Sequence, residues 1–218
     1  MAEAPRPGPE ARTASGWPAR LVLATNNRGK LQEVAAILGA AGVTVVGSAA
    51  VAPGWSVVED GATLAANARR KAESLARLTG LPALGDDSGL EVAALGGRPG
   101  VRSARYAGAH ATDAENTARL LRELAGVPDA ERAAAFRCAL VLAWPDGRSV
   151  EAEGRCDGFI ATTPRGEGGF GYDPVFVDPA SGRTFAELPA AAKNALSHRR
   201  RALDALVRAL DAAGGGRS

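Results

Sequence analysis

The alternation of apolar and polar residues predicts a chain in which short strands and amphipathic helices follow one another. Arg20–Thr25 is an apolar run typical of a buried strand, and apolar side chains recur at helical spacing from Leu31 onwards. Thr112 and Glu115 form a capping-box pattern at the start of another helix. Further elements predicted in the same way are strands at Val43–Gly47, Ala134–Ala143, Arg148–Gly154 and Val175–Val177, and helices at Thr63–Thr79 and Ala190–Ala212.

Other stretches carry turn signals. Ala83–Val92 is interpreted as a strand, a turn and a second strand, because residues 86–89 read Asp-Asp-Ser-Gly. Gly96–Gly108 is predicted to be a loop, and the last helix has a candidate interruption at Ser197. Strands alternate with helices early in the chain and pair as hairpins later. The expected fold class is therefore α/β with a mixed sheet.

Composition narrows the class of protein. A chain of 218 residues, 46% of them hydrophobic, is long enough for one core or two small lobes. The formal net charge of +2 gives no field that would attract duplex nucleic acid. The two cysteines, Cys138 and Cys156, match neither a metal spacing nor a disulfide framework, so we expect a reducing, cytoplasmic setting. No apolar run is long enough to span a membrane.

The same composition predicts the domain organisation. Residues 1–18 are rich in Pro, Ala and Gly and lack the apolar stretch of a signal peptide, so we expect a disordered leader. Residues 19–212 are expected to form a single domain, and residues 213–218 a disordered tail.

The glycine-rich segment 168–173, Gly-Gly-Phe-Gly-Tyr-Asp, is a candidate ligand-binding loop. Glycine lets a flat ligand approach the backbone closely, and Phe170 is a candidate platform for stacking a nucleobase. His198 and Arg199, further along the chain, are hydrogen-bond donors suited to a base edge or a phosphate. Taken alone, the segment is equally compatible with a turn between two strands.

A predicted strand-to-helix junction at Thr25–Lys30 is a candidate phosphate site. Backbone N–H groups at a helix N-terminus attract anions, and Lys30 adds a positive charge. The segment is not a P-loop, because Ala24 and Leu31 stand where that motif requires Gly and Ser or Thr. An ordinary polar loop is the alternative interpretation.

Two pairs of acids are candidate metal ligands. Glu59 and Asp60 precede a predicted helix, whose dipole they also complement. Asp86 and Asp87 are neighbours, and adjacent residues of an extended chain point to opposite faces, so they are not expected to share one role. Glu59 and one aspartate of the second pair offer the hard oxygen ligands that Mg²⁺ prefers. Most of the run Arg199–Arg201 is expected to be solvated surface.

Six sequence blocks occur in one order over Arg20 to Leu210. They are TNNRGK at 25–30, the Glu59 segment before a helix with Asn67 and Ala68, GDDSGLEV at 85–92, GGRPGVRSARYAG at 96–108, GGFGYDPVF at 168–176 and LSHRRRAL at 196–203. The chain in this respect resembles the Ham1-type non-canonical purine nucleoside triphosphate pyrophosphatases. The resemblance implies an elongated, two-lobed α/β fold with a mixed central sheet and a substrate cleft between the lobes. It also implies a homodimer and Mg²⁺-dependent hydrolysis of ITP, dITP and XTP to monophosphate and pyrophosphate.

The resemblance also implies roles for individual residues. Asp87 would be the catalytic proton acceptor and, with Glu59, a metal ligand. Asp60 follows Glu59 where the family often carries Thr or another polar residue, which leaves open which acid binds the metal. The substrate-binding residues would be Thr25, Asn26, Asn27, Arg28, Gly29, Lys30, Ser88, Phe170, Gly171, Tyr172, Asp173, Lys193, His198 and Arg199.

Three rival interpretations remain at the level of sequence. A non-enzymatic nucleotide sensor would keep the basic and aromatic groups without an acid placed on the attacking water. A nucleic-acid-binding module would rest on Arg199–Arg201, although the near-neutral charge weighs against it. A pyrophosphatase acting on modified pyrimidines is the third.

Overall fold

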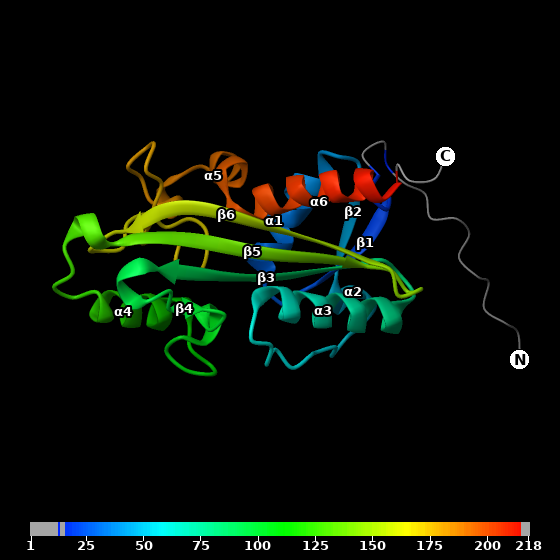
Figure 1. Ribbon diagram of the computed structural model, residues 1–218, viewed down its shortest axis with the longest axis horizontal. Helices are drawn as coiled ribbons and strands as arrows, with labels where there is room; N and C mark the ends of the chain where they lie inside the picture. The colour runs from blue at the N-terminus through cyan, green and yellow to red at the C-terminus, as the bar shows by residue number, and fades with distance from the viewer. Residues whose placement is uncertain (1–12, 14–15, 215–218) are drawn as a thin grey trace, which may run out of the picture.

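A seven-stranded mixed sheet forms the centre of the computed structural model, which describes residue 13 and residues 16–214 (Figure 1). The strand order is β2-β1-β3-β5-β6-β7, with β4 paired to β3. The strands are β1 Arg20–Ala24, β2 Thr44–Gly47, β3 Ala83–Val92, β4 Pro99–Gly100, β5 Ala133–Ala143, β6 Ser149–Ile160 and β7 Phe176–Val177. The α-helices are α1 Arg28–Gly39, α2 Ser48–Val51, α3 Leu64–Thr79, α4 Asp113–Glu123, α5 Ala190–Leu196 and α6 His198–Gly214.

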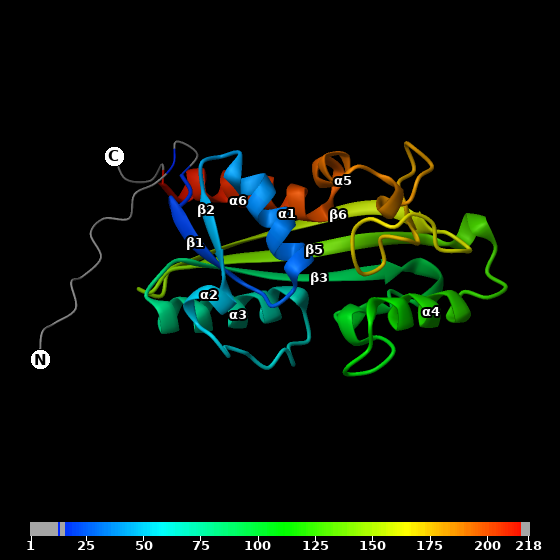
Figure 2. The same cartoon turned by 180° about the vertical axis from the view of Figure 1, so that it is seen from behind.

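Two lobes share the three long strands. β1 runs parallel to both β2 and β3, whereas β3, β5 and β6 pair antiparallel along the long axis of the molecule (Figure 1). Helices α1, α5 and α6 lie over one face of the sheet, and α3 and α4 lie over the opposite face (Figure 2). The α/β class, the mixed sheet and the elongated shape are therefore confirmed.

Three apolar clusters fill this frame. Leu23 and Leu140 pack with Leu206 between the sheet and helices α1 and α6. Ala68 and Leu75 of α3 pack against the opposite face of the same strands. The far lobe has its own cluster, built around Phe136, Phe176 and Phe185, whose rings lie within 6.0 Å of one another between centroids. The site described below lies where these lobes meet.

The predicted disordered leader extends too far along the chain. Trp17 is fully buried and belongs to the core cluster over α1 and α6, because an indole of this size contributes a large apolar area to burial. Residues 1–12 and 14–15 of the predicted leader lie outside the described residues. At the other end, α6 extends to Gly214, so the predicted tail also began too early, and residues 215–218 lie outside the described part.

The predicted strand-turn-strand at Ala83–Val92 is wrong. These residues form one continuous strand, β3, that pairs with β5 from Ala83 to Val92. Two of its small residues permit close backbone packing rather than a turn. A Cβ added to Gly85 would lie 2.0 Å from the Ala68 carbonyl oxygen of α3, and one added to Gly89 would lie 2.4 Å from that of Gly100.

Several local predictions are confirmed. Thr112 and Glu115 form a complete capping box at the start of α4. The final helix is interrupted at Ser197, whose backbone is extended, so that α5 and α6 are separate helices. The hairpin of β5 and β6 is present, although β6 continues to Ile160, six residues beyond the predicted end at Gly154. None of the described helices is long and apolar enough to cross a membrane.

Candidate active site

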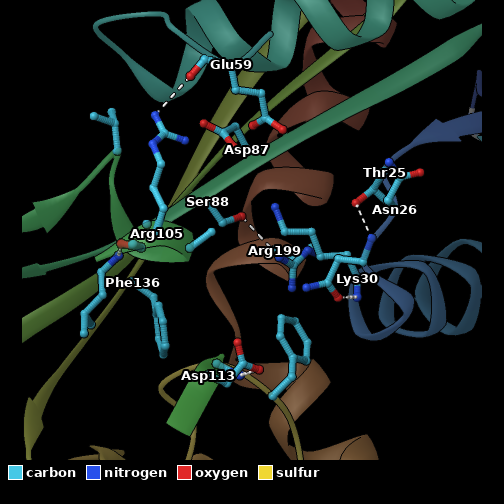
Figure 3. A pocket seen from close by; sticks show the side chains of 18 of the residues that line it. Thr25, Asn26, Lys30, Glu59, Asp87, Ser88, Arg105, Asp113, Phe136 and Arg199 are labelled. Carbon is cyan, nitrogen blue, oxygen red and sulfur yellow. Dashed lines mark hydrogen bonds between the residues drawn. The ribbon is translucent and has the colours of Figure 1, made fainter. Parts of the chain in front are cut away.

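A cavity of about 280 Å³ lies between the two lobes and receives side chains from both (Figure 3). Fourteen of the sixteen predicted site residues line it: Thr25, Asn26, Asn27, Lys30, Glu59, Asp87, Ser88, Phe170, Gly171, Tyr172, Asp173, Lys193, His198 and Arg199. Gly29 lies just outside this lining, where an added Cβ would be 2.4 Å from the Phe170 ring. Arg28 is exposed and does not line the cavity.

The β1–α1 junction opens into one end of this cavity. Asn27 caps α1 by accepting a hydrogen bond from the Lys30 N–H at 3.0 Å, and the Asn27 N–H donates to Thr25 Oγ at 3.1 Å. Ser48 Oγ, at the start of α2, donates to the Thr25 carbonyl at 2.9 Å and holds the junction in place. A helix N-terminus with its first turn fixed in this way is suited to an anion.

Asp86 faces α1 and α6 and serves the architecture of the site. Its carboxylate accepts from Lys30 Nζ at 2.7 Å and from Arg199 Nε at 2.6 Å, and Ser88 Oγ donates to it at 2.9 Å. Burial alone would raise the pKa of Asp86, but the charges of Arg199 and Lys30 outweigh it and hold that pKa well below its usual value. Asp86 therefore remains a buried anion that fixes two cations.

Asp87 faces the opposite side of the strand, toward α3. Lys71 Nζ lies 2.9 Å from Asp87 Oδ1 and 2.9 Å from Glu59 Oε2, so the two carboxylates converge on one ammonium group. Asn67 Nδ2 donates to Asp87 Oδ2 at 3.1 Å. Asp60 points elsewhere: it pairs with Arg70, and its side chain is 64% exposed.

These surroundings shift the pKa values of Asp87 and Glu59 in opposite directions. Burial raises the pKa of Asp87, and the attraction of Lys71 lowers it without cancelling the rise. Burial also opposes ionisation of Glu59, but Lys71 outweighs it and lowers the pKa of Glu59. The same ammonium group therefore lies between two carboxylates whose pKa values are displaced in opposite directions, upward for Asp87 and downward for Glu59.

Sequence reasoning missed Lys71 and Glu33. Lys71 is 5% exposed on the inner face of α3, and Glu33 is 8% exposed on α1. Glu33 pairs with Arg199 Nη1 and lies 2.6 Å from Lys193 Nζ, which also pairs with Asp173. A charged residue placed on the apolar face of an amphipathic helix was the available signal for both.

The glycine-rich loop closes the other end of the cavity. The Phe170 N–H donates to Asp173 Oδ2 at 2.8 Å, and the Gly171 N–H donates to Asp113 Oδ2 at 2.6 Å. The Phe170 ring lies 4.6 Å from Lys193 Nζ, while Tyr172 is buried and donates from its hydroxyl to the Ser103 carbonyl at 2.8 Å. Phe170 thus presents a ring to the cavity, and Tyr172 anchors the loop.

His198 lines the same cavity as the loop. Its ring stacks on Phe136 at 4.7 Å between centroids, and among the described residues Nδ1 has no hydrogen-bond partner. Burial and the positive charge of Arg199 lower the pKa of His198 well below its usual value. The imidazole is therefore neutral at pH 7.

This burial predicts a loss of stability in mild acid. The unfolded chain binds a proton at His198 near its ordinary pKa of about 6.5, whereas the folded chain does not, so stability falls as pH drops below that value. Between pH 7.5 and 5.5 the loss is about 1.4 kcal/mol, measured by urea unfolding, and His198→Phe removes it. The exposed His110 supplies the control: His110→Gln retains the loss, and an equal loss in His198→Phe would contradict the assignment.

The chain belongs to the Ham1 family, whose model matches residues 21–209. It is 53% identical over 184 residues to the dITP/XTP pyrophosphatase of Geobacter sulfurreducens, covering 84% of this chain and 92% of that protein. It is 50% identical over 190 residues to the dITP/XTP pyrophosphatase of Streptomyces avermitilis, covering 86% and 95%. The solved structure of a HAM1 protein from Coxiella burnetii superposes with a TM-score of 0.78 at 42% identity, covering 88% of this chain and 98% of that one.

Proposed function

We propose that this chain hydrolyses non-canonical purine nucleoside triphosphates, namely ITP, dITP and XTP, to the monophosphate and pyrophosphate, and so cleanses the nucleotide pool. The observation that carries the proposal is one cavity in which a cationic strand-to-helix junction, a convergent carboxylate pair and an aromatic glycine-rich loop meet. The similar curated proteins are named dITP/XTP pyrophosphatases, which supports dITP and XTP as substrates.

The geometry of the cavity supports a separate role for each of its ends. Lys30 and the N-terminus of α1 bind the phosphates of the nucleotide. Asp87 accepts a proton from a water that attacks the α-phosphorus. The new bond forms between that oxygen and phosphorus, the α–β anhydride bond breaks, and its electron pair leaves on pyrophosphate. A positioned general base of this kind contributes about 10²–10⁴-fold to the rate.

Glu59 and Asp87 are the residues that would hold Mg²⁺. Their oxygens converge on Lys71, and Mg²⁺ commonly takes one or two carboxylates together with phosphate oxygens and water. No group of three or more acidic, His or Cys side chains forms a metal site within the described residues, so substrate oxygens would have to complete the shell. A bound Mg²⁺ neutralises developing phosphate charge.

Glu59→Gln is predicted to raise the Mg²⁺ concentration that gives half-maximal pyrophosphate release about tenfold or more, because an amide keeps the shape of the carboxylate without its charge. The measurement is a Mg²⁺ titration at saturating ITP. Asp60→Asn is the matched control, since Asp60 lies outside the cavity lining. An unchanged titration in folded Glu59→Gln would remove Glu59 from the metal site.

The loop end of the cavity supports a role in base recognition. Phe170 offers a ring on which any base can stack, whereas His198 and Arg199 offer directional donors. Inosine and xanthine carry a 6-keto group that accepts a hydrogen bond, and adenine carries a donor there. A buried donor left unpaired costs about 1–3 kcal/mol, which disfavours adenine.

Phe170→Ala is therefore predicted to raise KM for ITP and for GTP by similar factors of about 5–150, corresponding to the loss of one base–aromatic stack. The ratio of kcat/KM for ITP over GTP should stay near that of the wild type. Phe159→Ala is the control, because Phe159 is a partly exposed ring outside the cavity lining. A collapsed ratio in Phe170→Ala would show that Phe170 discriminates between bases.

A substrate panel tests the function itself. ITP, dITP, XTP, GTP, ATP and modified pyrimidine triphosphates are incubated with Mg²⁺, and pyrophosphate and orthophosphate are both quantified. We expect pyrophosphate with the non-canonical purines above all. Orthophosphate and diphosphate as the products would refute the assigned bond cleavage, and binding without turnover would identify a nucleotide sensor.

The proposal also covers the location, the oligomeric state and the partners of the protein. We propose a cytoplasmic homodimer that acts on free nucleotides and binds no nucleic acid. Light scattering coupled to size exclusion gives the mass in solution, for which twice 22.2 kDa is expected.

A further inference from the structure

A second cavity lies beside the active-site cavity, against the segment that follows β4. It has a volume of about 330 Å³. Arg105 lines both cavities and so places them next to each other. The second cavity, called here the arginine pocket, is lined by Arg98, Pro99, Arg102, Arg105, Tyr106, Ala107, Gly108 and Arg119.

Positive charge in the arginine pocket is only partly compensated. Glu123 pairs with Arg98 and with Arg119, both at 2.8 Å, so one carboxylate serves two guanidinium groups. Arg105 donates to the neutral backbone carbonyl of Glu59 at 3.0 Å. The side chain of Arg102 is exposed and makes no ion pair or side-chain hydrogen bond within the described part of the chain, although its backbone N–H donates to the Pro99 carbonyl at 3.1 Å. Four guanidinium groups therefore line a space whose own lining contains no carboxylate, and Glu123 pairs with two of them.

The backbone that carries these arginines is fixed before any ligand arrives. Ser103 Oγ accepts from the Leu90 N–H at 2.8 Å and donates to the Gly100 carbonyl at 2.6 Å. Asn116 of α4 accepts from the Ala107 N–H at 2.7 Å and donates to the Ala104 carbonyl at 3.2 Å. A site whose backbone is held in this way loses little entropy when it binds.

We propose that the arginine pocket binds a small inorganic oxyanion of the phosphate or pyrophosphate class, separately from the nucleotide. Guanidinium groups match phosphate oxygens with paired N–H donors and cannot lose their charge. The pocket has about ten times the volume that a water molecule takes in the liquid, which leaves room for two linked phosphate groups. Its concave shape suits a small anion better than a polymer backbone.

Two sources could supply this anion. Pyrophosphate leaving the active-site cavity would pass Arg105, and that source rests on the function proposed above. Free phosphate from the solution is the other source. Binding is measured without turnover, so the proposal about the pocket stands or fails independently of the hydrolytic activity.

The test is isothermal titration calorimetry with sodium pyrophosphate in a Mg²⁺-free buffer of low ionic strength. We expect two binding events per wild-type chain, one in each cavity. Arg102→Gln should weaken one event about tenfold or more, and Lys30→Gln should weaken the other. Arg122→Gln, which removes an exposed charge from α4 outside the pocket, should retain both. Tighter binding of pyrophosphate than of phosphate assigns the pocket to the released product, and equal affinities assign it to free phosphate.

Three results would overturn the proposal: a single event in the wild type, two unchanged events in Arg102→Gln, or the loss of both events in Lys30→Gln. The exposed side chain of Arg102 has no hydrogen-bond or ion-pair partner among the described residues, so its variant should unfold at the wild-type temperature. Arg98→Gln, which alters a side chain that is 57% exposed, provides a second variant with the same expected outcome.

Discussion

We expect Asp87→Asn to lower kcat for ITP by about 10²-fold or more, while nucleotide still binds. The amide keeps the shape of the carboxylate and its contact with Asn67, but it cannot accept the proton of the attacking water. The measurement is pyrophosphate release at saturating ITP, together with nucleotide binding by calorimetry.

Asp86→Asn is the informative comparison, because Asp86 is fully buried and is absent from the cavity lining. Its loss should lower stability through Lys30 and Arg199 rather than abolish turnover in the folded fraction. If Asp86→Asn stopped the chemistry and Asp87→Asn left it near wild type, the two roles would have to be reversed.

Arg199→Ala is expected to destabilise the fold by about 3–5 kcal/mol, the second large effect. Arg199 is 1% exposed and pairs with Asp86 and Glu33, so its removal deprives each of these two buried carboxylates of one of its two cations. Urea unfolding of each variant gives the difference in free energy.

The neighbouring Arg200 is the matched control for that experiment. It forms an exposed pair with Asp204 one helical turn away, so Arg200→Ala should cost about 0.5 kcal/mol or less. Equal losses in the two variants would show that the buried network contributes nothing beyond an ordinary surface pair. For the folded fraction of Arg199→Ala, the ratios of kcat/KM for ITP over GTP and for ITP over ATP should be smaller than in the wild type.

Local signals predicted the parts of the fold that local physics determines. The capping box at Thr112, the hairpin between β5 and β6 and the break at Ser197 each depend on a few neighbouring residues. β3 was misread because Asp, Ser and Gly favour turns in isolation. In the folded chain, cations from α1, α3 and α6 satisfy Asp86 and Asp87, which removes the advantage of a solvated turn.

The candidate site likewise contains residues that the sequence predicted and residues that only the folded chain reveals. The residues that carry the resemblance were found from their blocks, and the cavity brings most of them together. Lys71 was overlooked as one of three consecutive cations, although its helical spacing from Ala68 and Leu75 places it on the apolar face of α3. Trp17 was also missed, because one aromatic residue inside a Pro- and Ala-rich stretch forms no periodic pattern. Its burial becomes apparent only when the apolar cluster into which it packs is known.

The absence of a side chain at Gly85 keeps the two aspartates from exchanging environments. The two residues on either side of Gly85 all carry a Cβ. If β3 moved along β5 by one or two positions, one of them would take the place of Gly85, and its side chain would clash with the Ala68 carbonyl. A shift by one position would also turn Asp86 toward Lys71 and Asp87 toward Arg199, because neighbouring residues of a strand face opposite ways. The difference in role between a structural anion and a reactive one is therefore enforced by close packing at the residue directly before Asp86, which has no side chain of its own.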